Sequence, residues 1–144
     1  MSSQLTLGVV WTAMTMGIAV VFMVCLRESV HLIEHTLAKF SAPVLTFVVL
    51  LAALLWLLIG ILAVTALWAL LFQWRGEFAD FTTAAYFSLI SITTVGYGDI
   101  TLSEQSRMLA GFAAADGFLI FGLYTAALFE VLSHLTPTKT PPMS

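Results

Sequence analysis

The stretch TTVGYGD at residues 93–99 decides how the rest of the chain is interpreted. Its glycines, Gly96 and Gly98, allow backbone angles that are closed to other residues, so successive carbonyl groups can turn toward one side of the strand. The stretch directly follows an apolar segment, residues 81–92, which begins after Asp80, a good helix N-cap residue. We therefore predict a short helix that leads into a glycine-containing strand.

The composition of the chain places this stretch in a membrane protein. Of its 144 residues, 60% are hydrophobic and 9% are charged, whereas a soluble domain carries about 25% charged residues. A soluble globular domain is therefore excluded. The formal charge of −3 and the lack of a dense Lys/Arg run also exclude nucleic acid as a partner.

Three segments are apolar enough to cross a membrane. A hydrocarbon core about 30 Å thick needs roughly 20 helical residues. Residues 5–26 and 44–72 are free of charged side chains, and residues 108–129 are interrupted only by Asp116. We predict three transmembrane helices in a chain whose surroundings are a lipid bilayer.

The segments outside these spans differ in character. Residues 27–43 repeat apolar side chains at helical spacing opposite polar ones, which predicts an amphipathic helix at the membrane interface. Residues 136–144 are rich in proline, which predicts a disordered tail.

The segment between the second and third spans indicates a pore. Residues 73–107 are too polar to face lipid, yet residues 81–92 are apolar and too short to cross. Non-helical backbone at membrane depth persists only where it is packed in protein or lines water. A column of carbonyl oxygens facing an axis can replace the water around a potassium ion.

Residues 94–98, TVGYG, preceded by Thr93 and followed by Asp99, resemble the signature filter of potassium channels. Residues 44–135 resemble the outer helix, pore helix, filter and inner helix of the two-helix bacterial channels. The fold class that this implies is an all-α integral membrane protein with a re-entrant pore helix and a filter loop. Residues 1–43, the first span with its linker, are an addition to that unit.

The resemblance also implies a site and an assembly. The potassium ligands are expected from the filter residues, namely Thr94, Val95, Gly96, Tyr97 and Gly98. One filter copy implies a homotetramer, in which each chain has three identical partners. Potassium is then the transported ion, and neither a cofactor nor a catalytic residue is expected. Hinge or gate positions on the inner helix are Gly117, Gly122, Thr125 and Phe129.

The family also implies an orientation, in the inner membrane of a bacterium. The filter and the N-terminus are expected outside, and the 27–43 linker and the tail are expected in the cytoplasm. Charge counting gives modest support under the positive-inside rule, with three basic residues inside against two outside. Four acidic residues then collect at the outer mouth, where they attract cations: Glu77, Asp80, Asp99 and Glu104.

Two acidic residues need partners that the family pattern does not supply. Many two-helix bacterial channels have a glutamate where this chain has Ile90, so Asp99 must find another partner. We predict that the Tyr86 hydroxyl donates to Asp99 and that Tyr86 and Phe87 support the filter together with Thr93. The alternative is that Tyr86 only fills the interior.

Asp116 lies within the third span, where an unpaired acid is costly. Its distance from Arg107 along a helix places it near the level of the end of the pore helix. We predict that it hydrogen-bonds to Ser88, Ser91 or Thr93, and the alternative is that it faces the ions.

Two other functions stay open at this point. His31, Glu34 and His35 form an H-x-x-E-H pattern, which is typical of a class of zinc peptidases, so a membrane metallohydrolase is one alternative. A regulatory or nonselective cation pore subunit is the other. The imidazoles of His31 and His35, with Glu130 and His134 near the inner mouth, also form a candidate pH sensor.

Overall fold

The computed structural model describes residues 2–37 and 42–135, and for residues 2, 31–37 and 42 it describes the backbone alone. These residues form four helices, α1 (Ser2–Leu37), α2 (Ala42–Trp74), α3 (Phe81–Ile92) and α4 (Arg107–Leu135). The described part of the chain contains no strand, so the predicted all-α class is confirmed. The predicted disordered tail, residues 136–144, lies outside the described residues.

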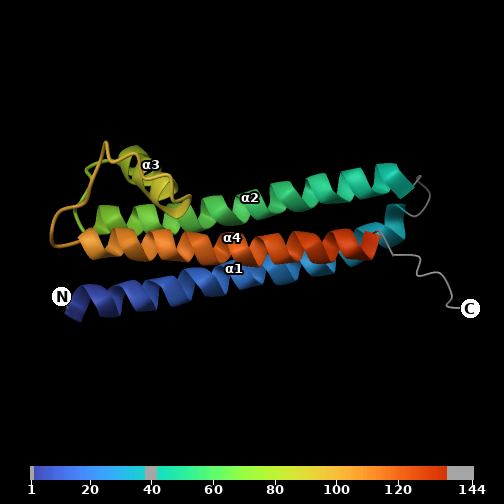
Figure 1. The fold of residues 1–144 in the computed structure, drawn as a ribbon, viewed down its shortest axis with the longest axis horizontal. Coiled ribbons are helices and arrows are strands. Elements are labelled where there is room, and N and C mark those ends of the chain that lie inside the picture. Colours follow the sequence, from blue (N-terminus) through green and yellow to red (C-terminus); the bar gives the residue numbers. More distant parts are fainter. Residues whose placement is uncertain (1, 38–41, 136–144) are drawn as a thin grey trace, which may run out of the picture.

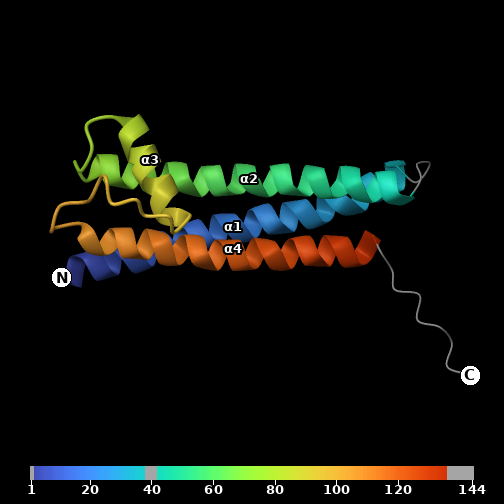
Figure 2. The same cartoon turned by 45° about the horizontal axis from the view of Figure 1, so that its top comes forward.

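Three of the helices are long and apolar enough to cross a membrane, as judged by length and composition: Ser3–Val30, Pro43–Trp74 and Arg107–Leu135. They lie side by side, with α1 and α4 parallel and α2 antiparallel to both (Figures 1 and 2). The short helix α3 packs on α2 and α4 at one end of this bundle. The start of α1 lies at that same end, as the predicted orientation requires.

The segment after the first span is not a separate element. The prediction of a helix after residue 26 is confirmed as far as Leu37, but its separation from the first span is wrong, because α1 runs through this region without a break. The physical reason is that residues 26–37 contain no proline or glycine, so nothing in this segment interrupts the helix.

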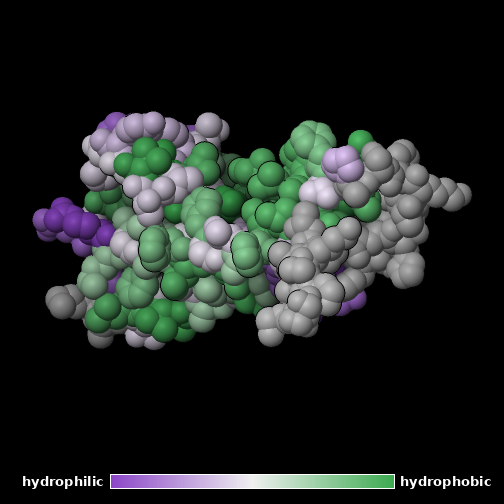
Figure 3. Space-filling view, turned by 45° about the vertical axis from the view of Figure 1, so that its right-hand side comes forward, coloured by the Kyte–Doolittle hydropathy of each residue, from purple (hydrophilic) through white to green (hydrophobic). Residues whose placement is uncertain are grey.

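The outward faces of the bundle are hydrophobic. The 18-residue window of α2 has a mean hydropathy of 3.1, the highest of the three spans, and large side chains such as Phe47 stay exposed, here by 68%. Figure 3 shows hydrophobic residues over the middle of one face, with hydrophilic residues at the α3 end. Lipid, and not water, suits such a surface.

An aromatic cluster holds α3 against α2. Trp68 and Phe72 are both fully buried on α2, with ring centroids 5.6 Å apart. Phe72 meets Phe87 of α3 edge-on at 5.3 Å, and Phe78 approaches Phe87 at 5.4 Å. Edge-to-face contacts of this kind contribute about 0.5–1.5 kcal/mol beyond area burial, so the cluster fixes α3 on the bundle.

The other face of α3 is fixed by a close backbone approach. A β-carbon on Gly117 would overlap the carbonyl group of Ile92, the last residue of α3. Only glycine therefore allows α4 to pass the end of α3 at this distance.

This contact predicts the effect of one methyl group. Gly117→Ala should lower the free energy of unfolding by about 1–3 kcal/mol, because the added methyl must push α3 and α4 apart. Gly111→Ala is the control on the same helix, since nothing lies within 4 Å of its β-carbon position, and it should be neutral or stabilising. Thermal melting of the purified protein in detergent measures both. Equal midpoints for the two variants would contradict the close approach.

Candidate functional site

Along residues 93–99, left-handed backbone conformations alternate with ordinary ones. The φ angles of Thr94, Gly96 and Gly98 are 59°, 50° and 75°, all in the left-handed region. Every second residue of the stretch is therefore left-handed, which lets carbonyl groups of neighbouring residues turn toward the same side. The sequence predicted this conformation at the two glycines but not at Thr94, where a β-branched residue adopts it at a cost.

The N–H groups of this stretch point back to the end of α3. The Thr94 N–H donates to the Ser91 carbonyl and the Gly96 N–H to the Ile90 carbonyl, both at 3.0 Å. These bonds pair carbonyl groups that the end of a helix otherwise leaves without a partner. Two N–H groups of this segment therefore hold it against the end of α3.

The predicted contact between the pore helix and Asp99 is confirmed. The Tyr86 hydroxyl of α3 donates to Asp99 Oδ2 at 2.8 Å. This hydrogen bond is the main cause that raises the pKa of Tyr86 above its ordinary value. Phe87 faces α2 instead, in the aromatic cluster, so it can support the filter only by placing α3. The supporting role of both residues stays a prediction.

The predicted hinge and gate residues lie on two faces of α4. Gly117 is buried against α3. Gly122, Thr125 and Phe129 lie on an exposed face, where the Phe129 side chain is 72% exposed. The Thr125 hydroxyl donates to the Phe121 carbonyl at 2.7 Å within the helix. This exposed stripe is available to line a pore or to meet another chain.

The prediction for Asp116 is wrong. Its Oδ2 atom accepts hydrogen bonds from Thr15 of α1 at 2.6 Å and from the Trp68 indole of α2 at 2.8 Å, and not from Ser88, Ser91 or Thr93. The side chain is fully buried. The helical rise gave the depth of Asp116, but not the direction of its side chain, which turns to α1 and α2.

The loops that flank α3 are tied together by Glu77. Its carboxylate accepts from the Ser103 N–H at 2.9 Å and from the Ser103 hydroxyl at 2.8 Å. Arg75 adds longer bonds of 3.4 Å to the Gln105 carbonyl and the Ser106 hydroxyl. Glu77 was predicted only as part of an acidic mouth. Spacing along the sequence gives no indication that Glu77 pairs with Ser103, which lies 26 positions later.

Asp80 has the predicted role at the start of α3. Its carboxylate accepts from the Thr83 N–H at 2.8 Å. This bond is the main cause that holds the pKa of Asp80 below its ordinary value. Asp80 therefore keeps its negative charge at neutral pH, beside the loop that leads into α3.

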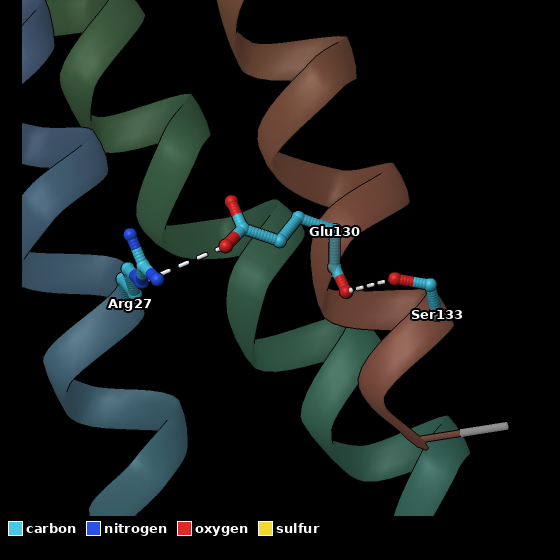
Figure 4. A network of polar contacts seen from close by, with 3 residues as sticks. All are labelled: Arg27, Glu130 and Ser133. Atoms are coloured by element: carbon cyan, nitrogen blue, oxygen red, sulfur yellow. Dashed lines mark hydrogen bonds and ion pairs between the residues drawn. The ribbon is translucent and has the colours of Figure 1, made fainter. Parts of the chain in front are cut away.

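At the other end of the bundle, α1 and α4 are joined by an ion pair. Arg27 Nε lies 3.5 Å from Glu130 Oε1, and the Ser133 hydroxyl donates to the Glu130 carbonyl at 2.8 Å (Figure 4). Glu130 and His134 line one cavity of about 320 Å³ between the two helices. The side chains of His31, Glu34 and His35 lie outside the described residues, so the pH sensor stays a prediction.

Comparison with known proteins identifies the class of this site. A family described as "Ion channel" matches residues 44–134, which is more than half of the chain. The chain therefore belongs to this family of ion channels.

Within that class, part of the chain is similar to a potassium channel. It is 45% identical over 53 residues to "TWiK family of potassium channels protein 18" of Caenorhabditis elegans. The match covers 34% of this chain and 11% of that relative, so the chain spans only a small part of the relative's length. No solved structure gives a significant match.

Membership of a channel family excludes the metallohydrolase alternative, since the protein is a channel and not an enzyme.

The Glu77 clamp predicts a dependence of stability on acid. Burial acts to raise the pKa of Glu77, but hydrogen bonds from Ser106 and Ser103 and the charge of Arg75 outweigh it, so the pKa lies below its ordinary value. A lowered pKa contributes stability that is complete above the unfolded value and is lost as the pH falls through the folded value. The thermal midpoint should therefore drop as the pH falls below the ordinary pKa of glutamate, about 4.3, and Glu77→Gln should remove part of that drop.

Glu104→Gln is the matched control for this measurement. Glu104 has an exposed side chain next to Ser103, in the loop between α3 and α4, and it pairs with Arg107 at 3.9 Å. The control should follow the wild-type pH profile. If both variants follow that profile, the clamp does not contribute to the stability of the outer loops.

Proposed function

We propose that four copies of this chain assemble around one axis and conduct potassium ions selectively and passively. In this assembly, the carbonyl oxygens of Thr94, Val95, Gly96 and Tyr97, with the Thr94 hydroxyl, replace the water around the ion. The observation that carries the proposal is the left-handed backbone at every second residue, combined with the Thr94 and Gly96 N–H groups that are bonded to the end of α3.

Electrostatics support the same proposal. Buried main-chain oxygens without donors are costly in a membrane, and a dehydrated cation offsets that cost. The carbonyl end of α3 also directs partial negative charge toward the region beyond Ile92. Selection of potassium among cations then depends on the filter oxygens.

Exposed side chains support an assembly. Val95 and Tyr97 are 52% and 73% exposed in the single chain, and Phe118 and Phe129 are each 72% exposed on α4. One chain has a single filter strand, which cannot surround an ion. A closed ring of identical copies surrounds the ion and covers such surfaces.

The proposed orientation places the α3 end outside and the Arg27–Glu130 end in the cytoplasm. The start of α1 and the filter loop share one end of the bundle (Figure 1), which agrees with a chain that crosses three times. The location in a bacterial inner membrane is proposed only from the resemblance to bacterial channels.

Flux into vesicles tests the proposal. Purified protein reconstituted in lipid vesicles should take up rubidium or potassium in preference to sodium, and barium should block this uptake. Equal uptake of sodium and rubidium would favour the nonselective pore instead. Lack of uptake in vesicles that contain the assembled protein would favour a regulatory subunit.

Two glycine variants isolate the role of the filter backbone. Gly96→Ala should lower the preference for potassium over sodium by about tenfold, because a side chain at a left-handed position costs about 1–2 kcal/mol and the strand relaxes away from this shape. Gly76→Ala is the control. Its φ of 75° is also left-handed and its β-carbon position is also open, but it lies outside the filter.

The control separates strain from function. Gly76→Ala should carry a similar backbone cost and keep the wild-type ion preference. If Gly96→Ala keeps this preference as well, the left-handed backbone of residues 94–98 is not the basis of selectivity.

A further inference from the structure

We infer that Asp116 is a positioning residue of the conduction pathway, which fixes the rotation of α4 beside the filter by joining it to α1 and α2. This inference rests on the proposed function and adds a role for the first helix. Thr15 lies in α1, outside the residues 44–134 that match the channel family.

The chemistry of the site indicates a specific anchor. Asp116 is fully buried, and both of its donors reach the same oxygen, Oδ2, from two other helices. Thr15 and Trp68 are themselves fully buried. Intramembrane acids are costly unless they are paired, and they are retained mainly where they serve a function. Three buried polar side chains from three helices therefore meet at one atom.

The next residue along α4 links this anchor to the filter. Gly117 passes against the carbonyl group of Ile92, and Ile92 ends the helix that leads into Thr93 and Thr94. Because successive residues of a helix are rotated by about 100°, Asp116 faces α1 and α2 while Gly117 faces α3. A rotation of α4 would therefore disturb both contacts together.

A second connection runs through the Trp68 side chain. Its indole N–H binds Asp116, and its ring stacks beside Phe72, which meets Phe87 of α3. Trp68 therefore contacts both Asp116, which anchors α4, and the aromatic cluster that holds α3. Loss of the hydrogen bond frees the indole to shift against the cluster that holds α3.

Further contacts show that α1 lies in register along α4. A β-carbon on Gly8 would overlap the ring of Phe112, one turn before Asp116, and Arg27 pairs with Glu130 near the other end. Among these contacts between α1 and α4, the hydrogen bond from Thr15 to Asp116 is polar and fully buried. The exposed pair at Arg27 is worth about 1 kcal/mol or less, so the anchor at Asp116 determines the alignment.

The geometry also predicts which property of Asp116 matters. Both donors use Oδ2, whereas Oδ1 has no hydrogen-bond partner among the described residues. An asparagine presents one acceptor oxygen in the same place. Asp116→Asn should therefore retain function, because the acceptor and not the charge holds the helices.

The test uses the full-length protein in vesicles, with assembly checked by size-exclusion chromatography before each flux measurement. The readouts are the ratio of rubidium to sodium uptake and the barium concentration for half block, since both report the shape of the filter. The variants are Asp116→Asn, Asp116→Leu, Thr15→Val and Trp68→Phe. The control is Thr12→Val, one turn away on α1, because its hydroxyl has no hydrogen-bond partner in the described part of the chain.

The expected result is a shift of about fivefold or more in either readout for Thr15→Val and for Trp68→Phe, the range typical of coupling between distinct elements. Asp116→Asn and Thr12→Val should stay within about twofold of the wild type. In the Asp116→Leu protein, addition of Thr15→Val should cause no further shift, because the two groups act through one bond. If Asp116→Leu does not assemble, the two donor variants decide the outcome.

Two results would overturn the inference. One is wild-type selectivity and block in both Thr15→Val and Trp68→Phe. The other is an equal loss in Thr12→Val, which would show a general effect of altering α1. Failure of the proposed function is distinguishable, because the wild-type vesicles themselves would then show no preference for rubidium over sodium.

Discussion

The structure depends on the need of every polar backbone group in a membrane for a partner. Helices meet this need within themselves, whereas a strand at the same depth requires partners from elsewhere. In residues 94–98, the N–H groups and the carbonyl groups meet this need in different ways. The Thr94 and Gly96 N–H groups bind the carbonyl end of α3, at Ser91 and Ile90, and in the proposed function the carbonyl groups face an ion. The left-handed angles at Thr94, Gly96 and Gly98 make this division possible.

The remaining elements hold the end of α3 in place. The aromatic cluster around Phe72 fixes its outer side, and Gly117 lets α4 approach the backbone of Ile92. Tyr86 joins the same helix to Asp99 beyond the strand. The first helix, which lies outside the matched family region, contributes through the buried bond between Thr15 and Asp116.

Much of this fold could be predicted from the sequence, because length, hydropathy and capping are local properties. The three spans and the N-cap at Asp80 were found in this way. The Tyr86–Asp99 bond was predicted from the family resemblance, because Ile90 stands where many relatives have a glutamate. The partners of Asp116 were missed, since the helical rise gives depth and not the direction of a side chain. The Glu77–Ser103 clamp was missed because it joins loops that only the packed helices bring together.

The most direct test is an experimental structure of the assembled protein in a membrane mimetic with rubidium or thallium, whose anomalous scattering marks ion positions. We predict four chains around one axis, with a column of ions ringed by the carbonyl oxygens of Thr94, Val95, Gly96 and Tyr97. An assembly in which these oxygens point away from a shared axis, or in which no ion lies on it, would contradict the account.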